Sequence, residues 1–475
     1  MDERALFGRA ARLAADYRAG LDERPVARPV DLDALRTTLG GPMPGPSTTP
    51  RETIERLAAA ADPGLVASAG PRYFGFVVGS GHPAATAADW LASAWNQNAG
   101  LYALSPAAAV VEEVASRWLV ELFGLPPGTS VGFPTGATMA NFTALAAARD
   151  RVLRDVGWDV EEDGLIGAPP LNVVVGAEAH VTIFASLQML GLGRGERRVQ
   201  RVAADEQGRM RPDALRATLA SLDGPTIVCA QAGNVNSGAF DPLPEIAAAV
   251  RGQGGWLHVD GAFGLWAAVA PARRHLVDGL ELADSWTTDA HKWLNVPYDS
   301  GLVFVRDAKA HLAAMRLGAA YYVETGGAER DSYNWVPESS RRARGFAVWA
   351  ALVSLGRDGL AELIERDCAN AARMADRLRS GPGVTILNEV ALNQVLVRFA
   401  PAGAAAGDAD ARTRDVIARV QADGTCWLGG TTWHDMAAMR ISVSGWQTTA
   451  EDIDRSAEAI LRCAAAAAAE ADAAD

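Results

Sequence analysis

Hydrophobic positions in the middle of the chain follow two alternating spacings. From about residue 130, short continuous apolar runs typical of buried strands alternate with segments whose apolar residues recur at helical spacing. Near-continuous apolar strands separated by helices predict a mostly parallel sheet that is covered on both faces. The predicted strands are 171–175, 198–202, 226–230, 255–259, 285–288 and 302–305, and the predicted helices are 138–153, 182–189, 212–222 and 244–252.

The amino-terminal part of the chain shows a different pattern. Residues 1–70 predict helices and connectors, with an amphipathic helix at 5–18 and a second helix at 48–60. Thr49 and Glu52 have the spacing of a capping box at the start of the second helix. This part is too small for a core of its own, so we expect it to pack on something else, such as a second subunit.

The carboxyl-terminal part predicts a small α+β unit, because strands and helices there follow a long helical segment. Thr448 and Glu451 have capping-box spacing before the last helix. We therefore divide the chain into an N-terminal helical and extended segment at 1–75, a large domain at 76–355 and a small C-terminal domain at 356–475. The predicted helices of this part are 346–355, 360–378, 408–422 and 450–460, and the predicted strands are 384–387, 394–397 and 439–443.

Composition narrows the class of protein. Of the 475 residues, 49% are apolar and 21% are charged, which is typical of globular domains. A net charge of -13 argues against a nucleic-acid partner. No apolar run is long enough for a membrane span, and no apolar segment of the signal-peptide type begins the chain. The four cysteines are far apart and lack CxxC spacing, so we expect a reduced, cytoplasmic protein without a cysteine metal site.

The sequence neighbours of Lys292 are unusual for a lysine on the surface. It lies between His291 and Trp293, and between the predicted strands 285–288 and 302–305. A buried lysine can lose its proton, and the neutral amine is a nucleophile for an aldehyde. The alternative is a lysine at a strand end whose side chain reaches solvent. Taken alone, this stretch does not decide between the two interpretations.

Residues 132–138 (Gly-Phe-Pro-Thr-Gly-Ala-Thr) form a turn of small residues that begins a predicted helix. The first N–H groups of a helix and its dipole favour an anion. Gly136 and Ala137 would let a phosphate approach, and Thr138 adds a hydroxyl donor. An ordinary N-cap at Thr138 is the alternative.

Two polar residues follow predicted strands. Asp260 comes after the apolar run 256–259, where a carboxylate is costly unless it is paired. A protonated ring nitrogen is a suitable partner, and Ala262 would let a flat ring lie close; an ion pair with an arginine such as Arg342 is the alternative. His180 also ends a strand, and either stacks on a flat heterocycle or forms a structural hydrogen bond.

Together these residues supply a phosphate site, a stacking histidine, an aspartate for a pyridinium nitrogen and a lysine for an aldehyde. Pyridoxal 5′-phosphate requires these four contacts. A dinucleotide cofactor is less consistent with the chain, because no predicted strand is followed by G-x-G-x-x-G.

The chain resembles the group II pyridoxal-phosphate decarboxylases, the family of aromatic-L-amino-acid and glutamate decarboxylases, over nearly its whole length. Residues 289–294 (Asp-Ala-His-Lys-Trp-Leu) resemble the N-P-H-K-W box of that family, and residues 258–262 (His-Val-Asp-Gly-Ala) resemble its H-V-D-A-A box. The resemblance implies an α/β fold of type I, similar to aspartate aminotransferase. It also implies a homodimer whose active site lies at the subunit interface.

The resemblance also implies a role for individual residues. Lys292 would bind the cofactor aldehyde, Asp260 would hold the pyridinium and His180 would stack on the ring. Asn234, in a segment where the usual threonine pair is replaced, would contact the ring, and His291 would lie at the phosphate. The cofactor-binding residues expected in all are Gly136, Ala137, Thr138, His180, Asn234, Asp260, Ala262, His291 and Lys292, and the catalytic residues are Lys292, Tyr321 and His180.

Tyr321 lies where the family has a tyrosine that returns a proton to Cα, and Tyr322 is a close competitor. Dimer packing is the alternative role for both. Arg342 and Arg344 fall in an arginine box that resembles one in the family. They either organise the site and bind a carboxylate, or are surface charges of a helix.

We therefore predict a decarboxylase that converts an L-amino acid, aromatic or medium-sized aliphatic, to its amine and CO2. Phe76 is expected to contact the substrate, and so is Trp433, from a loop of the partner subunit that includes 429–432. Where the resemblance implies F-x-P-T in aromatic decarboxylases, residues 77–80 of this chain are Val-Val-Gly-Ser. This difference leaves the choice between an aromatic and an aliphatic substrate undecided.

Two other functions compete with decarboxylation. One keeps the cofactor but changes the reaction to aldehyde synthesis, an aldolase or lyase reaction, or transamination. Tyr321 favours decarboxylation, since the resemblance implies a phenylalanine at this position in the aldehyde synthases of the family. The other is a non-catalytic binding scaffold, which Lys292 and Asp260 oppose.

Overall fold

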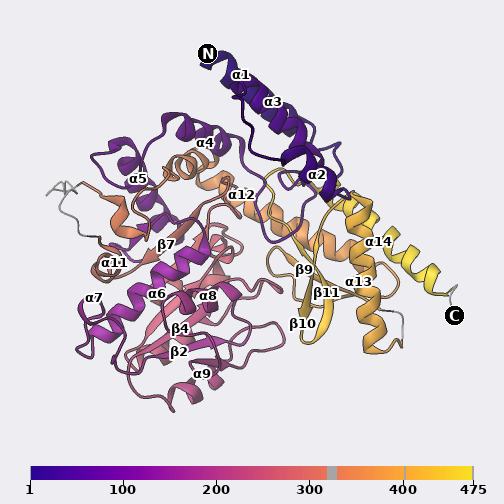
Figure 1. Ribbon diagram of the computed structural model, residues 1–475. Helices are drawn as coiled ribbons and strands as arrows, with labels where there is room; N and C mark the ends of the chain where they lie inside the picture. Colours follow the sequence, from indigo (N-terminus) through magenta and orange to yellow (C-terminus); the bar gives the residue numbers. More distant parts are fainter. Residues whose placement is uncertain (1, 318–328, 401–402, 473–475) are drawn as a thin grey trace. The chain divides into compact units, whose positions relative to one another are not determined.

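The computed structural model describes residues 2–317, 329–400 and 403–472 (Figure 1). The chain divides into two compact units, which are treated separately below. The larger unit consists of Gly81–Ala371 and Asn388–Gln394, and the smaller unit consists of Met1–Ser80, Ala372–Leu387 and Val395–Asp475.

A seven-stranded sheet forms the centre of the larger unit, in the order β1-β7-β6-β5-β4-β2-β3. Strands β2 to β6 pair in parallel, whereas β7 is antiparallel to both of its neighbours. The prediction of a mostly parallel sheet is confirmed. The strands are β1 Ser130–Gly132, β2 Asn172–Gly176, β3 Val199–Val202, β4 Thr226–Gln231, β5 Trp256–Asp260, β6 Ser285–Asp289 and β7 Gly301–Val305.

Helix α6 (Ala137–Arg154) lies directly on this sheet, against β5, β6 and β7, and packs beside α8 (Val181–Met189) (Figure 1). Its buried face is rich in alanine, which favours helix and lets the backbone approach the strands closely. Buried residues such as Val173, Ile183 and Val303 complete this core.

The other helices of the larger unit flank the sheet or connect its strands. They are α4 Pro83–Trp95, α5 Pro106–Phe123, α7 Val160–Asp163, α9 Pro212–Leu219, α10 Leu243–Arg251 and α11 Ala308–Met315, with 3-10 turns at Gly264–Val269, Arg274–Val277, Leu280–Leu282 and Ser332–Trp335. Helix α12 (Gly345–Arg379) is kinked at Gly356, where φ is +62°. This position explains why the sequence predicts two helices there, since a residue in that conformation interrupts a helix.

The smaller unit combines N-terminal helices with a four-stranded sheet in the order β10-β11-β9-β8. The predicted capping box of Thr49 and Glu52 is present. At the last helix the box is one residue later than predicted, between Thr449 and Asp452. The elements are α1 Glu3–Ala19, α2 Leu32–Leu39, α3 Pro50–Ala61, a 3-10 turn at Asp62–Gly64, β8 Val384–Ile386, β9 Gln394–Phe399, α13 Ala406–Asp423, β10 Gly429–Trp433, β11 Met436–Ser442 and α14 Ala450–Asp472.

The elements that the pattern did not predict include α2, α7, α11, β1 and β10. The loop predicted at 429–432 is wrong, because these residues form β10 and pair with β11. Two glycines and two threonines give that strand no apolar alternation, and its pairing partner lies outside the local pattern. Among the described residues, no helix is both long and apolar enough to cross a membrane, and no group of three or more potential metal ligands occurs.

Candidate active site

Lys292 lies in the turn that follows β6, close to the carboxyl ends of the parallel strands. Its Nζ is 3.2 Å from Oδ2 of Asp289, and its side chain is 16% exposed. The turn is fixed because the N–H groups of Ala290 and His291 both donate to the carbonyl oxygen of Ser300. The lysine is therefore mostly buried against a carboxylate, which contradicts the alternative of a side chain that reaches freely into solvent.

Asp289 connects the lysine to the start of α6. Its Oδ1 accepts a hydrogen bond of 2.6 Å from the N–H of Ala137 and lies 3.5 Å from Nε2 of His291. The small residues around it are needed for this approach: a Cβ on Gly301 would lie 2.5 Å from the backbone of Gly136. Lys292, His291, Gly136 and Ala137, four of the expected cofactor-binding residues, thus lie close together.

The first turn of α6 has the geometry of an anion site. Gly136 is the N-cap residue and has no side chain to satisfy the free N–H groups. Thr138 follows in the first turn, where N–H groups have no partner inside the helix. Asp289 already accepts from Ala137, so the donors left for an anion come from the next residues of the turn.

Asp260 ends β5 and is 4% exposed. Its carboxylate accepts from Nδ2 of Asn141 at 3.3 Å and from the N–H of Ala262 at 3.1 Å. Within the described ranges no basic side chain lies at ion-pair distance from it. The alternative of an ion pair between Asp260 and Arg342 is wrong, because the guanidinium of Arg342 pairs with Asp89 at 2.6 Å. A buried carboxylate with two N–H donors but no cation is suited to a cationic ligand.

His180 is the N-cap residue of α8. Its Nδ1 lies 2.9 Å from Oγ1 of Thr182 and also accepts from the N–H of that residue. This structural hydrogen bond, one of the two predicted interpretations, is present. His180 and Asp260 line the same small cavity.

Asn234 has a local structural function that the sequence did not predict. Its Oδ1 accepts from the N–H groups of Asn236 and Ser237, which closes a turn after β4. The side chain is buried. Its expected contact with the cofactor ring stays a prediction, and these bonds already account for an asparagine at this position.

The predicted substrate contacts belong to the smaller unit. Phe76 is 61% exposed and stacks on Trp427 with ring centroids 5.4 Å apart. Trp433 is buried in β10 and packs with Leu396 and Ala438 in an apolar cluster. Both contacts with substrate stay predictions, and the burial of Trp433 gives it a core role that the predicted loop did not suggest.

Tyr321 and Tyr322 lie outside the described residues. The two arginines of the predicted arginine box form ion pairs, Arg342 with Asp89 and Arg344 with Asp299. Their neighbour Arg341 was given no role, yet it is fully buried against Glu112 at 2.8 Å.

Sequence reasoning missed Asn141, which lies between α6 and the strands. Its four-residue spacing from Ala137 and its position among buried alanines could have identified it as a polar group directed at the sheet. Asp367 was also missed. It accepts from Nε1 of Trp293, and burial raises the pKa of its carboxyl to about 8. No local signal marks it, because its partner is distant in sequence.

Burial also determines the charge of nearby histidines. It lowers the pKa of His291, against the opposing effect of Asp289. It lowers the pKa of His258 to about 4, again against the opposing charge of Asp260. Both rings therefore favour the neutral form at neutral pH.

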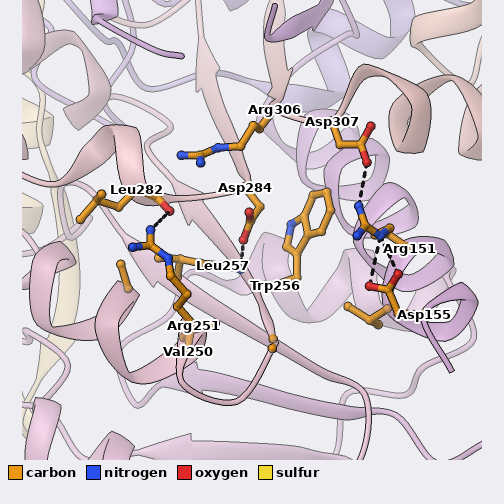
Figure 2. Close-up of a pocket in the computed structure, with 14 residues that line it drawn as sticks. Arg151, Asp155, Val250, Arg251, Trp256, Leu257, Leu282, Asp284, Arg306 and Asp307 are labelled. Carbon is orange, nitrogen blue, oxygen red and sulfur yellow. Dashed lines mark hydrogen bonds and ion pairs between the residues drawn. The ribbon is translucent and has the colours of Figure 1, made fainter. Parts of the chain in front are cut away.

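A separate cavity of about 250 Å³ lies at the opposite, amino-terminal ends of β5 and β6 (Figure 2). Figure 2 shows Arg151 between Asp155 and Asp307, and Asp284 on the other side of Trp256. This cavity contains none of the predicted site residues. In sheets of this kind ligands bind beyond the carboxyl ends of the strands, which is where Asp260 and Lys292 lie.

The residues at the carboxyl ends fit pyridoxal phosphate on structural grounds. Asp260 is a buried carboxylate in need of a cation, Lys292 is a mostly buried amine and α6 begins in small residues with free donors. The carboxylate suits the ring nitrogen of the cofactor, the amine suits its aldehyde, and the free N–H groups suit its phosphate.

Comparisons with known proteins agree with this fit. The conserved domain of pyridoxal-dependent decarboxylases matches residues 51–400. Tryptophan decarboxylase 1 of Oryza sativa subsp. japonica is 30% identical over 466 residues, 93% of this chain and 90% of that protein. L-2,4-Diaminobutyrate decarboxylase of Rhizobium meliloti is 34% identical over 341 residues, 68% of this chain and 66% of that one. The crystal structure of Oryza sativa TDC with PLP and tryptamine superimposes with a TM-score of 0.90 at 26% identity, and 98% of each chain is covered.

Proposed function

Because this chain belongs to the family of pyridoxal-dependent decarboxylases, we propose that Lys292, Asp260 and His180 carry its chemistry at the carboxyl ends of β5 and β6. The protein is a pyridoxal phosphate-dependent enzyme that converts an L-amino acid to its amine and CO2. The buried carboxylate of Asp260, which has no cation beside it in the described part of the chain, is the observation that carries the assignment of roles.

Bound pyridoxal phosphate supplies an electron sink for the charge that remains on Cα when carbon dioxide departs. Asp260 would hold a proton on the ring nitrogen, since a carboxylate stabilises a cation at hydrogen-bond distance. Lys292 would attach to the aldehyde carbon and be displaced by the substrate amine. The contact of its Nζ with Asp289 orients this amine before the cofactor binds. His180 would cover one face of the ring.

The phosphate would bind at the start of α6. Thr138 and its neighbours offer N–H donors at the positive end of an 18-residue helix. His291 lies beside Gly136 and completes this end of the site. We propose Tyr321 as the group that returns a proton to Cα, with Tyr322 as the alternative, on the resemblance of the sequence.

We propose a substrate whose side chain is aromatic or medium-sized and aliphatic. The relatives that support this range act on tryptophan and on 2,4-diaminobutyrate, as their names state. Aldehyde synthesis remains the second candidate, and Tyr321 argues against it.

We also propose that the enzyme is a homodimer in the cytoplasm. Helices α1 and α2 bury no residue, and Phe7, Leu32 and Met43 are more than half exposed, which supports packing of this segment on a partner subunit. The division of the chain at residues 75 and 355 stays part of this proposal. Free, buried thiols at Cys229, Cys368 and Cys426 support a reducing compartment. Light scattering of the purified chain tests the dimer.

The lysine assignment can be tested with unusual clarity. The chain has only two lysines, Lys292 and Lys309, among its 44 lysine and arginine residues. Lys309 is exposed at the start of α11 and is the matched control. After reconstitution with pyridoxal phosphate and reduction with borohydride, mass spectrometry should find the cofactor on Lys292. Lys292→Ala should lose the reducible visible band, whereas Lys309→Ala should keep it.

The reaction itself is tested by incubating the wild-type enzyme with each of the twenty amino acids and measuring CO2 and amine. We expect release of both in equal amounts from an aromatic or medium-sized substrate. Aldehyde and ammonia in place of the amine would favour the second candidate. A label on Lys309 alone would overturn the site, whichever product is found.

A further inference from the structure

A buried polar cluster lies behind Asp260, and Asn141 is its centre. Nδ2 of Asn141 donates to Oδ2 of Asp260 at 3.3 Å. On its other side, Oδ1 of Asn141 lies 2.9 Å from Nε2 of His258 and 2.7 Å from Oγ1 of Thr287. Asn141, His258 and Thr287 are fully buried. No residue of this cluster other than Asp260 has a part in the chemistry proposed above.

The cluster extends along β5 and β6 beyond His258. Nδ1 of His258 lies 2.9 Å from Oγ of Ser285, which also accepts from Nε1 of Trp256 at 2.9 Å. Trp256 can only donate, so Ser285 accepts from it and has its own hydroxyl hydrogen to give to Nδ1 of His258. When Ser285 gives this hydrogen to Nδ1, the proton of the neutral imidazole lies on Nε2, which donates to Asn141.

Asp260, at the other end of this cluster, determines which groups donate and which accept. An ionised Asp260 only accepts hydrogen bonds, so the amide of Asn141 must face it with Nδ2. Oδ1 then faces His258 and Thr287, which must both donate. The Asp260 end therefore fixes the direction of these hydrogen bonds, and the contacts of Ser285 with Trp256 and His258 are compatible with it.

Asn141 also reaches the histidine that lies on the cofactor side. Its Nδ2 is 3.3 Å from Oγ1 of Thr182. Since Thr182 accepts there, its hydroxyl hydrogen is free for Nδ1 of His180, 2.9 Å away. Nδ1 of His180 is then an acceptor, which places the proton of this ring on Nε2.

We propose that Asn141 is a positioning residue that holds Asp260 with its charge directed at the cofactor ring nitrogen. The proposal rests on the proposed role of Asp260. It adds that the orientation of Asp260 depends on one amide, whose Oδ1 is held on the other side by His258 and Thr287.

A substitution of similar shape tests the proposal. Asn141→Asp replaces the Nδ2 donor by an oxygen that faces Asp260, and two adjacent carboxyl groups share a proton instead of both ionising. Asp260 should then stabilise the ring nitrogen less well. Thr287→Val is a milder variant that leaves the contact with Asp260 intact and should also fold if Asn141→Asp does not. Thr143→Val is the matched control, because Thr143 is a buried residue of the same helix whose hydroxyl bonds only to the Met139 carbonyl.

The readout is binding of two cofactors to the full chain in the Lys292→Ala background, so that no covalent bond contributes. One is pyridoxal phosphate, and the other is its analogue with C–H in place of the ring nitrogen. We expect Asn141→Asp to weaken pyridoxal phosphate binding about tenfold or more, because a hydrogen bond to a charged group is lost. The analogue should be much less affected, Thr287→Val should show the same selectivity to a smaller extent, and Thr143→Val should change neither affinity.

Equal weakening of both cofactors by Asn141→Asp and by Thr287→Val would overturn the proposal, since it would show a merely structural role. Unchanged binding of both would also overturn it. Asp260→Asn in the same assay separates this failure from a failure of the proposed site. If Asp260→Asn does not selectively weaken pyridoxal phosphate, Asp260 is not the partner of the ring nitrogen and both assignments fall.

Discussion

Asp284 directly precedes β6 and Asp260 ends β5, so these two aspartates lie at opposite ends of the strand pair, in different surroundings. At the amino ends, Asp284 accepts from the N–H of Leu257 and faces the charges of Arg306 and Arg251. At the carboxyl ends, Asp260 accepts only from neutral N–H groups among the described residues. Burial raises the pKa of Asp284 in spite of the arginines.

The different surroundings of Asp284 and Asp260 distinguish a charged cavity from a site suited to bind a cationic ligand. The amino-terminal cavity has volume and charge, but Arg151 pairs with Asp155 and Asp307 (Figure 2), and Arg251 and Arg306 donate to the carbonyl oxygens of Leu282 and Glu281. The carboxyl-terminal site has a carboxylate whose charge is left for a ligand. An unbalanced buried charge is therefore more informative than the size of a cavity.

The largest expected effect distinguishes these two aspartates directly. Asp260→Asn should lower kcat about a hundredfold or more, because charge that develops during the reaction loses its stabilising partner. Asp284→Asn keeps an acceptor for the N–H of Leu257 and should leave kcat nearly unchanged. Steady-state rates of amine formation with saturating cofactor decide the matter. Similar losses in both variants would show that the two ends of the strands are not functionally distinct.

The framework of this site could be predicted from the sequence because its signals are local. An apolar strand followed by Asp260, and a turn of small residues before α6, each occupy a few consecutive positions. Burial on a parallel sheet then fixes which edge they share. The same holds for the break of α12, where Gly356 lies within the gap between the two predicted helices.

The remainder depends on partners that are distant in the chain. Asn141 meets Asp260 across 119 residues, and Trp293 meets Asp367 across 74. No spacing rule connects such pairs. Strand β10 was missed for the same reason, since its order comes from pairing with β11 and not from its own composition.

His258 lies between the two ends, and its burial gives a pH-dependent prediction of moderate size. Its pKa in the folded chain is about 4, below the ordinary value of 6.5, so the unfolded chain binds the proton more tightly. Stability should therefore be lost as pH falls from about 6.5 to 4, by up to about 3 kcal/mol. In His258→Gln this loss should be absent, whatever the stability of the variant at neutral pH.

Melting temperatures between pH 4 and 7 measure this effect. His275→Gln is the control, since His275 is exposed on the same unit. The prediction fails if wild type and His258→Gln lose stability in parallel below pH 6.5.

Trp256 tests whether the amino-terminal end influences the reaction. Trp256→Phe removes the donor to Ser285 and should cost about 1 kcal/mol of stability. Trp286→Phe is matched, because Trp286 is buried and donates to the carbonyl of Leu280. Asp260 and Thr287 still orient Asn141 in both variants, so we expect both to keep the wild-type kcat. A selective loss of kcat in Trp256→Phe would instead show coupling between the two ends.

The smallest effect is expected from the ion pairs that line the amino-terminal cavity. Arg151 lies 2.9 Å from Asp155 and 2.8 Å from Asp307, but 43% of its side chain is exposed. Solvent and salt screen such pairs, so Arg151→Ala should cost less than about 1 kcal/mol. The difference in melting temperature from wild type should shrink further in about 1 M salt. A loss of several kcal/mol that persists in salt would mean that this cavity, like the site at the other end of the strands, holds charges that solvent does not reach.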